Sequence, residues 1–353
     1  MTEPFSASPL AQAFAQGPVW LPQQMDATTG RVLLVRMAEE EYRQASFLDQ
    51  RMLTQKNQPQ WAGWDELEAM DQAGRRDADL IFHIGHVGST LIARLLGELA
   101  GVFSLREPQI LRNFADLAAT SGQPHAIWSP DRFDERMETA IGWLSRTFRP
   151  DDRSLIKATS FVGEIAGPLL GPDRKALLLT VSPQRYIETI LAGDNSRQEL
   201  AMLASPRLHR LHKRLGTEDW RLWDLSEPVR AAMSWLSEMT ALDAAAHSVP
   251  NGHVRWLDFD DFLANPAERL ADIARFFGTE AGSDTVSALT EGPLMKQYSK
   301  APDHEYSADL RETLLAQARA KHQDGIAEAL TWLNDAASRH PVVDRLLNEH
   351  MRT

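Results

Sequence analysis

One junction near residue 80 limits the folds open to this chain more than any other feature. Residues 80–84 form a short apolar run, 85–90 read Gly-His-Val-Gly-Ser-Thr, and 90–100 carry leucines at helical spacing. A short apolar run that ends at a glycine is typical of a buried strand, and leucines three or four residues apart are typical of an amphipathic helix. The sequence therefore predicts a buried strand, a tight turn and a helix in direct succession.

Strand and helix patterns keep alternating after this junction. Further strands are predicted at 102–105, 154–156, 176–181 and 254–259, and a helix is expected to follow the third of these from Gln184. Alternating strands and helices predict a mostly parallel sheet with helices on both faces, because each parallel connection has to cross the sheet. We therefore expect an α/β fold of three layers with a helical C-terminal part.

The two ends of the chain differ in regularity. Residues 31–37 predict a short strand and 38–53 a charged amphipathic helix, whereas 1–30 and 55–76 show few periodic signals. Further helices are expected from Ser226, over 265–277, and over 309–321 and 324–338. We expect a single domain, in which residues 1–78 form an N-terminal extension packed on the core of residues 79–353.

Composition excludes several classes of function. The chain has 353 residues, a formal net charge of −12 and no cysteine. An acidic chain lacks the basic face of a general nucleic-acid binder, and without cysteine it forms neither disulfides nor thiolate sites. No apolar run is long enough to span a membrane, and the first residues lack the basic start and apolar stretch of a secretion signal. We therefore expect a cytoplasmic protein without nucleic-acid or membrane partners.

The turn at 85–90 has the features of an anion-binding loop. The first N–H groups of a helix lack intrahelical partners and carry partial positive charge, and Gly85 and Gly88 let the backbone approach phosphate oxygens closely. Ser89 and Thr90 add hydroxyl donors. Because Gly88 directly precedes Ser89, the lysine of the common ATPase loop is absent. The loop predicts a phosphate site, and a glycine-rich turn without a ligand is the alternative.

The elements that follow the loop resemble, in order and spacing, those of the sulfotransferase family, which uses 3′-phosphoadenosine 5′-phosphosulfate (PAPS) as sulfonyl donor. In the protein-tyrosine and glycan branches a Glu-containing turn follows the next strand, as at 104–108 (Ser-Leu-Arg-Glu-Pro). The family's Lys-containing strand end is matched at 156–159 (Ile-Lys-Ala-Thr), and its late acidic pattern at 259–266 (Phe-Asp-Asp-Phe-Leu-Ala-Asn-Pro). The resemblance extends over about residues 79–300.

The resemblance implies a P-loop nucleotide-binding fold with PAPS as donor, no metal, and a hydroxyl or amine acceptor on a small molecule, glycan or peptide. Glu107 is then the candidate general base, while His86 and Lys157 are candidate cations beside the leaving phosphate. His86 stands where the family usually has lysine or arginine. The nucleotide-binding residues that this implies are Gly85, His86, Val87, Gly88, Ser89, Thr90, Ser182, Arg185 and Thr189.

Each of the three catalytic candidates has a structural alternative. Glu107 can form a surface salt bridge with Arg106 or Arg112. His86 can face solvent in the turn, and Lys157 can extend from its strand end into water.

The second nucleotide-binding element departs from the family's pattern. The family's arginine, which binds the 3′-phosphate, aligns with Val181, and its serine aligns with Thr189. A valine cannot bind phosphate, so Ser182, Arg185 or Arg197 would have to substitute. Two other hypotheses therefore stay open, namely an enzyme of the same fold with a different nucleotide donor, and a non-catalytic relative that binds a partner.

Two further groups of charged residues admit more than one interpretation. Asp260 and Asp261 look like a metal pair, but their alignment with the family's late acidic pattern indicates that they cap or brace the sheet. Residues 207–214 collect arginine, histidine and lysine, for which we expect a solvated basic helix, with a site for an anionic acceptor as the alternative.

Overall fold

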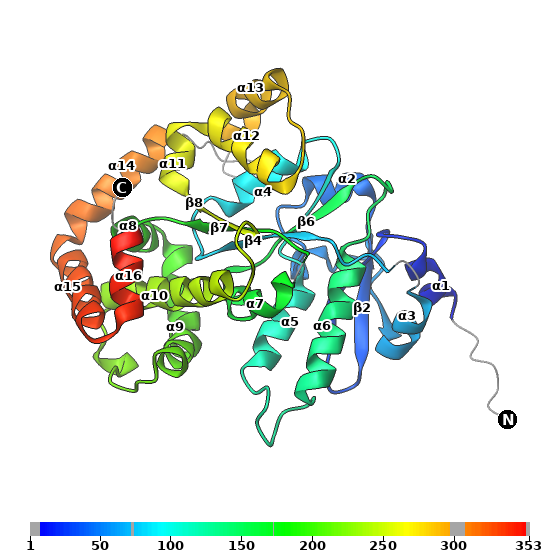
Figure 1. Ribbon diagram of the computed structural model, residues 1–353, viewed down its shortest axis with the longest axis horizontal. Helices are drawn as coiled ribbons and strands as arrows, with labels where there is room; N and C mark the ends of the chain where they lie inside the picture. Colours follow the sequence, from blue (N-terminus) through cyan, green and yellow to red (C-terminus); the bar gives the residue numbers. More distant parts are fainter. Residues whose placement is uncertain (1–7, 72–73, 172, 297–307, 351–353) are drawn as a thin grey trace.

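The computed structural model describes residues 8–71, 74–171, 173–296 and 308–350. At its centre lies a five-stranded sheet in the order β5-β6-β4-β7-β8, and every neighbouring pair is parallel (Figure 1). The strands are β4 (Asp79–His83), β5 (Val102–Arg106), β6 (Arg153–Lys157), β7 (Ala176–Thr180) and β8 (Val254–Asp258). All five match the strands predicted from the sequence to within two residues at either end.

Helices cover both faces of this sheet and give three layers. The helices α4 (Ser89–Gly97) and α12 (Pro266–Phe277) lie on one face, while α5 (Gln109–Ala118), α6 (Pro130–Leu144), α7 (Ala166–Leu170) and α10 (Glu227–His247) lie on the other (Figure 1). Every residue of β4 and of β7 is buried, as expected for strands covered on both sides. The α/β fold class is confirmed.

Because all neighbouring pairs are parallel, the carboxyl ends of the five strands lie at one edge. From β4 the chain crosses to β5 at the far edge, returns to β6 beside β4, and then moves to β7 on the other side. The strand order therefore reverses direction at β4, and ligands of open α/β sheets bind at such a point. The loop of residues 84–88 leaves β4 at this position.

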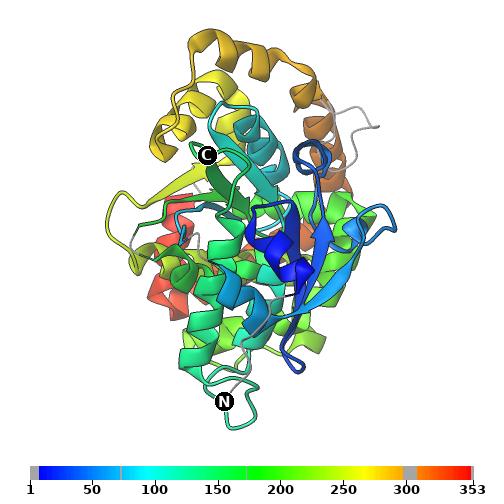
Figure 2. The same cartoon turned by 90° about the vertical axis from the view of Figure 1, so that its right-hand side faces the viewer.

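A second, antiparallel sheet of three strands lies beside the main domain (Figure 2). It comprises β1 (Trp20–Asp26), β2 (Arg31–Arg36) and β3 (Gln60–Gly63). The N–H of Met25 donates to Asn113 Oδ1 of α5 at 3.0 Å, which ties β1 to the core. Only β2 was predicted, because Pro22 and a glutamine pair interrupt the apolar pattern of β1.

The helix expected over residues 38–53 is wrong in length. The structure has α2 (Glu39–Gln44), after which Ala45 is extended, and a short 3-10 turn η1 (Gln50–Met52). The helix ends early because the buried guanidinium of Arg106 donates to the carbonyl oxygens of Tyr42, Arg43 and Ala45. The segment after α2 then runs beside the end of β5, where Leu48 N–H donates to Arg106 O at 2.7 Å.

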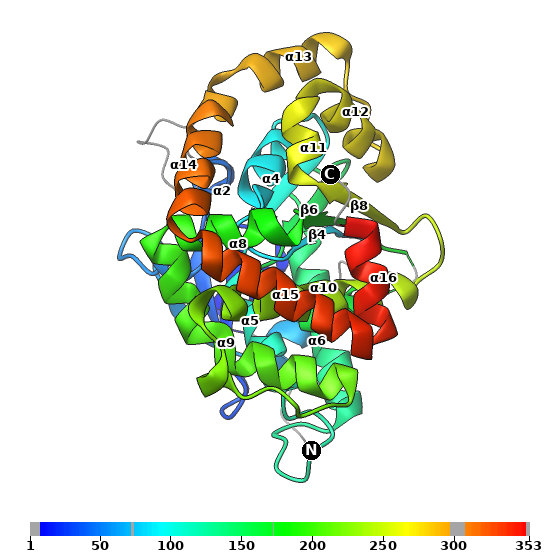
Figure 3. The same ribbon diagram turned by 90° about the vertical axis from the view of Figure 1, so that its left-hand side faces the viewer.

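The C-terminal third is helical, as predicted. It includes α14 (Ala308–Lys321), α15 (Gln323–Arg339) and α16 (Pro341–His350) (Figure 3). α14 packs on α8 (Pro183–Ala192), and α15 packs on α10. The remaining elements are α1 (Pro9–Ala15), α3 (Trp64–Met70), α9 (Asp194–Leu215), α11 (Phe259–Ala264), α13 (Ser283–Glu291), and the 3-10 turns η2 (Ser160–Ile165), η3 (Leu222–Asp224) and η4 (Pro293–Lys296).

The basic run at 207–214 lies in α9 and is not the solvated helix that we expected. Arg207 is 2% exposed and Arg210 is 6% exposed. Arg210 donates to the carbonyl oxygens of Phe161 and Ala115, so it joins α9 to α5 and to η2. None of the helices in the described ranges has both the length and the apolarity needed to cross a membrane.

Candidate functional site

The loop between β4 and α4 has an unusual backbone. Gly85, His86 and Gly88 all have positive φ, at 90°, 56° and 68°. Gly88 is the N-cap of α4, and no side chain caps this helix end. The first turn of α4 therefore directs backbone N–H groups into the loop, which is the arrangement that binds anions. Ser89 and Thr90 follow, with side chains that are almost fully buried.

Position 88 admits only glycine. An added Cβ would lie 2.0 Å from Cε2 and 2.1 Å from Cζ of Phe259. Phe259 follows β8 directly and is 3% exposed. Its buried ring packs against the backbone of Gly88 and restricts the loop. Both the left-handed backbone and this close approach require glycine.

The start of the loop is held by His83. Gly85 N–H donates to His83 Nδ1 at 3.0 Å, and His83 Nε2 lies 2.9 Å from Ala158 O. The accepting Nδ1 places the ring proton on Nε2, so His83 bridges the ends of β4 and β6 as a neutral imidazole. The N–H of Gly85 is thus used inside the loop, and a bound anion would meet the later N–H groups.

Lys157 and Glu107 meet beside the loop. The Lys157 side chain is 1% exposed, and its Nζ donates to Thr90 Oγ1 at 3.3 Å and to a carboxylate oxygen of Glu107. Glu107 N–H in turn donates to Lys157 O at 2.6 Å. Lys157 therefore points into the site and not to water. Glu107 pairs with Lys157, whereas Arg106 binds carbonyl oxygens and Arg112 pairs with Asp116.

Two of the three catalytic candidates have a strained backbone. Within the described ranges, the non-glycine residues with left-handed φ are Gln58, His86 and Glu107, and the last two have φ of 56°. Such a conformation disfavours a non-glycine residue by roughly 1 kcal/mol. Strain of this kind persists where the surrounding structure holds it, and it is concentrated at functional sites.

His86 lies against α9. Its side chain is 14% exposed, and its Nε2 is 3.2 Å from Glu199 Oε2. The side chain therefore does not extend into solvent. Glu199 was not predicted, because it lies 113 residues along the chain in a helix whose pattern gave no signal for this role.

The residues that the sequence predicts for a second nucleotide-binding element lie mainly around the start of α8. Ser182 is the N-cap of α8 and accepts no capping hydrogen bond. Thr189 donates to Arg185 O at 2.7 Å, within the helix. Val181 is 1% exposed, and its carbonyl oxygen accepts from Trp235 Nε1 at 3.0 Å. Arg197 pairs with Glu227 at 2.7 Å and is not part of this group.

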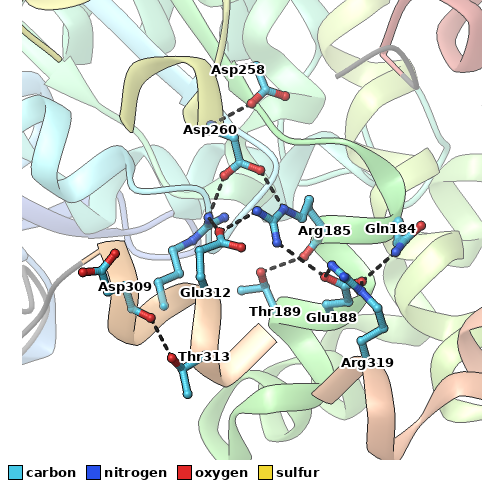
Figure 4. A network of polar contacts seen from close by, with 11 residues as sticks. Gln184, Arg185, Glu188, Thr189, Asp258, Asp260, Asp309, Glu312, Thr313 and Arg319 are labelled. Carbon is cyan, nitrogen blue, oxygen red and sulfur yellow. Dashed lines mark hydrogen bonds and ion pairs between the residues drawn. The ribbon is translucent and has the colours of Figure 1, made fainter. Parts of the chain in front are cut away.

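Arg185 belongs to a network of ion pairs that the sequence did not reveal. Figure 4 shows its guanidinium directed at Asp260 and Glu312, at 2.9 Å and 2.5 Å. Arg311 of α14 also pairs with Asp260, at 2.6 Å. Arg319 of the same helix pairs with Glu188 of α8. The network joins α8, α11 and α14, which are far apart in the sequence.

Arg311 connects this network to the loop. Its guanidinium carbon lies 5.5 Å from the centre of the Phe259 ring, and that ring contacts Gly88. The side chain is 11% exposed, and its Nη2 is buried without a hydrogen-bond partner among the described residues. A buried, unsatisfied guanidinium N–H is unfavourable, so a ligand oxygen beside it would be stabilising.

The acidic residues after β8 brace the structure. Asp258 accepts from Asp260 N–H at 2.7 Å as the N-cap of α11, and burial raises the pKa of Asp258 to about 6. Asp260 binds two arginines. Within the part of the chain that the structure describes, no group of three or more His, Asp or Glu side chains is arranged to hold a metal ion.

No protein-family model and no curated protein matches the sequence. Among solved structures, the chain is similar to the sulfotransferase domain from the Synechococcus PCC 7002 olefin synthase, at 14% identity over 72% of this chain and 94% of that chain, with a TM-score of 0.40. It is similar to sulfotransferase STF9 from Mycobacterium avium, at 10% identity over 91% and 97% of the two chains, with a TM-score of 0.39. Mouse sulfotransferase SULT7A1 complexed with PAP matches at 12% identity over 78% and 90%, with a TM-score of 0.38. Identities and TM-scores are low, so the roles of individual residues rest on the geometry of the site.

Proposed function

We propose that this chain is a sulfotransferase that moves the sulfonyl group of PAPS to a hydroxyl or amine of a small molecule, glycan or peptide. The observation that carries the proposal is that Lys157 Nζ contacts both Thr90, in the first turn of α4, and Glu107. A phosphate-binding turn, a buried cation and a carboxylate thereby lie within one contact of each other. Transfer of a charged group requires these three parts.

The loop of residues 84–88 and the first turn of α4 would hold the 5′-phosphate side of the donor. The N–H groups of the uncapped helix end supply the main donors, and the hydroxyl groups of Ser89 and Thr90 lie beside them. Phe259 closes against Gly88 and keeps the loop in its left-handed form. The loop therefore has its phosphate-binding conformation before the ligand arrives, which reduces the entropy lost on binding.

In the proposed reaction Glu107 accepts the proton of the acceptor hydroxyl. The acceptor oxygen forms a bond to sulfur while the bond from sulfur to the bridging phosphate oxygen breaks, and that oxygen leaves as part of 3′-phosphoadenosine 5′-phosphate (PAP). Lys157 couples the proton transfer to Glu107 with the departure of the phosphate oxygen. As Glu107 becomes neutral it loses its attraction for Lys157, whose charge is then available to stabilise the leaving phosphate.

We propose that Arg311 and Arg185 bind the 3′-phosphate in place of an arginine at position 181. The buried Nη2 of Arg311 supports this assignment, because it is an unused donor on a guanidinium that lies near the Phe259 ring. Arg185 is held by Asp260 and Glu312 and would share them with the incoming phosphate. Charge-assisted hydrogen bonds of guanidinium to phosphate are among the strongest available.

One observation favours the second candidate, an enzyme of the same fold with another nucleotide donor. Val181 is part of the core and offers no phosphate contact, and each of Arg185, Arg311 and Arg319 already has a carboxylate partner. A donor without a 3′-phosphate would leave these ion pairs undisturbed.

Nucleotide binding and turnover separate these possibilities. The purified protein is titrated by calorimetry with PAP, with adenosine 5′-phosphate and with ATP, and is then supplied with PAPS and a panel of hydroxyl and amine acceptors. We expect PAP to bind more tightly than the other two and PAP to be released in the presence of an acceptor. Tighter binding of ATP would overturn the assignment of the donor. Binding of PAP without turnover over a broad panel would favour a non-catalytic relative.

A further inference from the structure

A row of four charged side chains leads from the loop into the interior. His86 Nε2 lies 3.2 Å from Glu199 Oε2, and Glu199 Oε1 lies 3.8 Å from Arg207 Nη2. Arg207 Nε then donates to Glu238 Oε1 of α10 at 2.7 Å. Positive and negative groups alternate along the row when the His86 ring is protonated.

The inner end of the row is an ion pair buried between α9 and α10. Arg207 is 2% exposed, and it also donates to Ser160 Oγ at 3.2 Å. Although burial by itself lowers the pKa of Arg207, the neighbouring Glu238 carboxylate raises it above the ordinary value. Tyr186 of α8 also lies beside this cluster, and burial raises the pKa of its hydroxyl, so it stays neutral. Two further arginines of α9 face Glu238: Arg210, which donates to backbone carbonyl oxygens, and Arg214, which pairs with Glu164 at 2.7 Å.

Glu199 is the carboxylate of the row that contacts the His86 ring. Arg207 donates to Glu238 at 2.7 Å and lies 3.8 Å from Glu199, whereas the His86 ring lies 3.2 Å from Glu199. In a partly buried site a carboxylate at hydrogen-bond distance favours the charged form of its neighbour. The His86 side chain is 14% exposed, so water screens this attraction only in part.

We infer that Glu199 keeps His86 protonated at neutral pH and so gives the phosphate loop a permanent positive charge. This inference rests on the proposed nucleotide site and adds to it a positioning residue that acts through His86. Glu199 does not have to touch the ligand. A lone imidazole would be largely neutral above pH 7, and phosphate binding would then weaken with rising pH.

The experiment follows the dissociation constant of PAP from pH 6 to pH 8 in the wild type, in Glu199→Gln and in Glu199→Gln combined with His86→Lys. In the wild type we expect the affinity to change with pH only through the second ionisation of the phosphate groups of PAP, whose pKa is about 6 and which affects all three proteins alike. In Glu199→Gln the affinity should approach that of the wild type near pH 6 and fall below it by a further factor of roughly ten per pH unit well above the pKa of a free imidazole, because binding then requires the uptake of one proton. In the double variant a lysine charge replaces the imidazolium, so the affinity should again follow the pH profile of the wild type.

Glu227→Gln is the matched control. Glu227 pairs with Arg197 of α9 at 2.7 Å and is 38% exposed, against 35% for Glu199. Its removal breaks an ion pair of the same helix at similar exposure, so it should leave the pH profile of the wild type unchanged. A Glu199→Gln profile that coincides with that of the wild type would overturn the inference.

The charge of His86 can also be measured without any nucleotide. Ring ¹⁵N chemical shifts of the free protein, with the His86 signal assigned from its loss in His86→Gln, report the protonation state directly. We expect an imidazolium at pH 7.5 in the wild type and a neutral ring in Glu199→Gln. PAP binding by a protein whose His86 is neutral at pH 7.5 would refute this inference and leave the proposed function intact. An imidazolium in a protein that binds no PAP would refute the proposed function instead.

Discussion

The contact between Gly88 and Phe259 makes Gly88→Ala the most quantitative test of the loop. The new methyl carbon would lie 2.0 Å from Phe259 Cε2, far inside van der Waals contact, and the residue would keep a φ of 68°. Phe259 is buried and follows β8 directly, so its ring has little room to move.

Two contributions determine how much unfolding free energy Gly88→Ala loses. A left-handed alanine is disfavoured by roughly 1 kcal/mol, and overpacking in a core adds about 1–3 kcal/mol. The expected loss of unfolding free energy is therefore about 2–4 kcal/mol. Because the entropy of unfolding is near 2.1 cal/mol/K per residue, a loss of 3 kcal/mol in a chain of 353 residues lowers the melting temperature by about 4 °C.

Gly216→Ala separates the two contributions. Gly216 has a φ of 65°, and an added Cβ there meets nothing within 4 Å. This variant should lower the melting temperature by only about 1 °C and leave PAP binding unchanged, whereas Gly88→Ala should lower both. Calorimetric melting of the wild type and both variants measures the difference. Equal melting temperatures for the two variants would show that Phe259 does not hold the loop as described.

Other changes test the remaining parts of the site. Glu107→Gln should reduce turnover with PAPS by a factor of roughly 10²–10⁴ while the dissociation constant of PAP stays within about twofold, and unchanged turnover would exclude Glu107 as the base. Lys157→Met leaves the Glu107 carboxylate without its buried partner and should lower the unfolding free energy by about 2 kcal/mol in urea titrations, so undiminished stability would contradict the pair. Arg311→Met should weaken PAP by roughly 10- to 100-fold in calorimetry but not adenosine 5′-phosphate, and equal losses for both would place Arg311 away from the 3′-phosphate. The native pKa of Asp258 is raised to about 6 from an ordinary 3.8, so its contribution to stability is full below pH 4 and is lost as pH rises through 6. Asp258→Asn keeps a neutral cap and should therefore gain about 1–2 kcal/mol over the wild type between pH 4 and pH 7, and parallel stability curves would contradict this.

The parts of the fold that follow from local pattern were predicted correctly. The strands β4 and β7 are buried throughout and apolar over 80–82 and 176–179 because both faces are covered, and α12 ends at Phe277, before Gly278 with a φ of 78°. The end of α2 was missed because it depends on Arg106, which is about 60 residues away along the chain. The sequence of residues 38–53 alone cannot reveal a contact with a side chain so far along the chain.

The residues of the candidate site likewise fall into those that the sequence predicted and those that it did not. The glycine-containing turn, Glu107 and Lys157 could be found because they follow strand ends, and parallel strands bring their carboxyl ends to one edge. Glu199 and Arg311 could not be found, because each lies on a helix that approaches the loop only after the chain has folded. Arg207 was mistaken for a solvated side chain because composition does not reveal its buried partner Glu238.

The central claim is that the loop of residues 84–88 and the first turn of α4 bind the 5′-phosphate of the donor nucleotide. A crystal structure of the protein with PAP tests it most directly. The account predicts that the 5′-phosphate lies within hydrogen-bond distance of the N–H groups of Ser89 and Thr90, and that the 3′-phosphate contacts Arg311. PAP at full occupancy elsewhere on the protein, or an empty loop at saturating PAP, would contradict it.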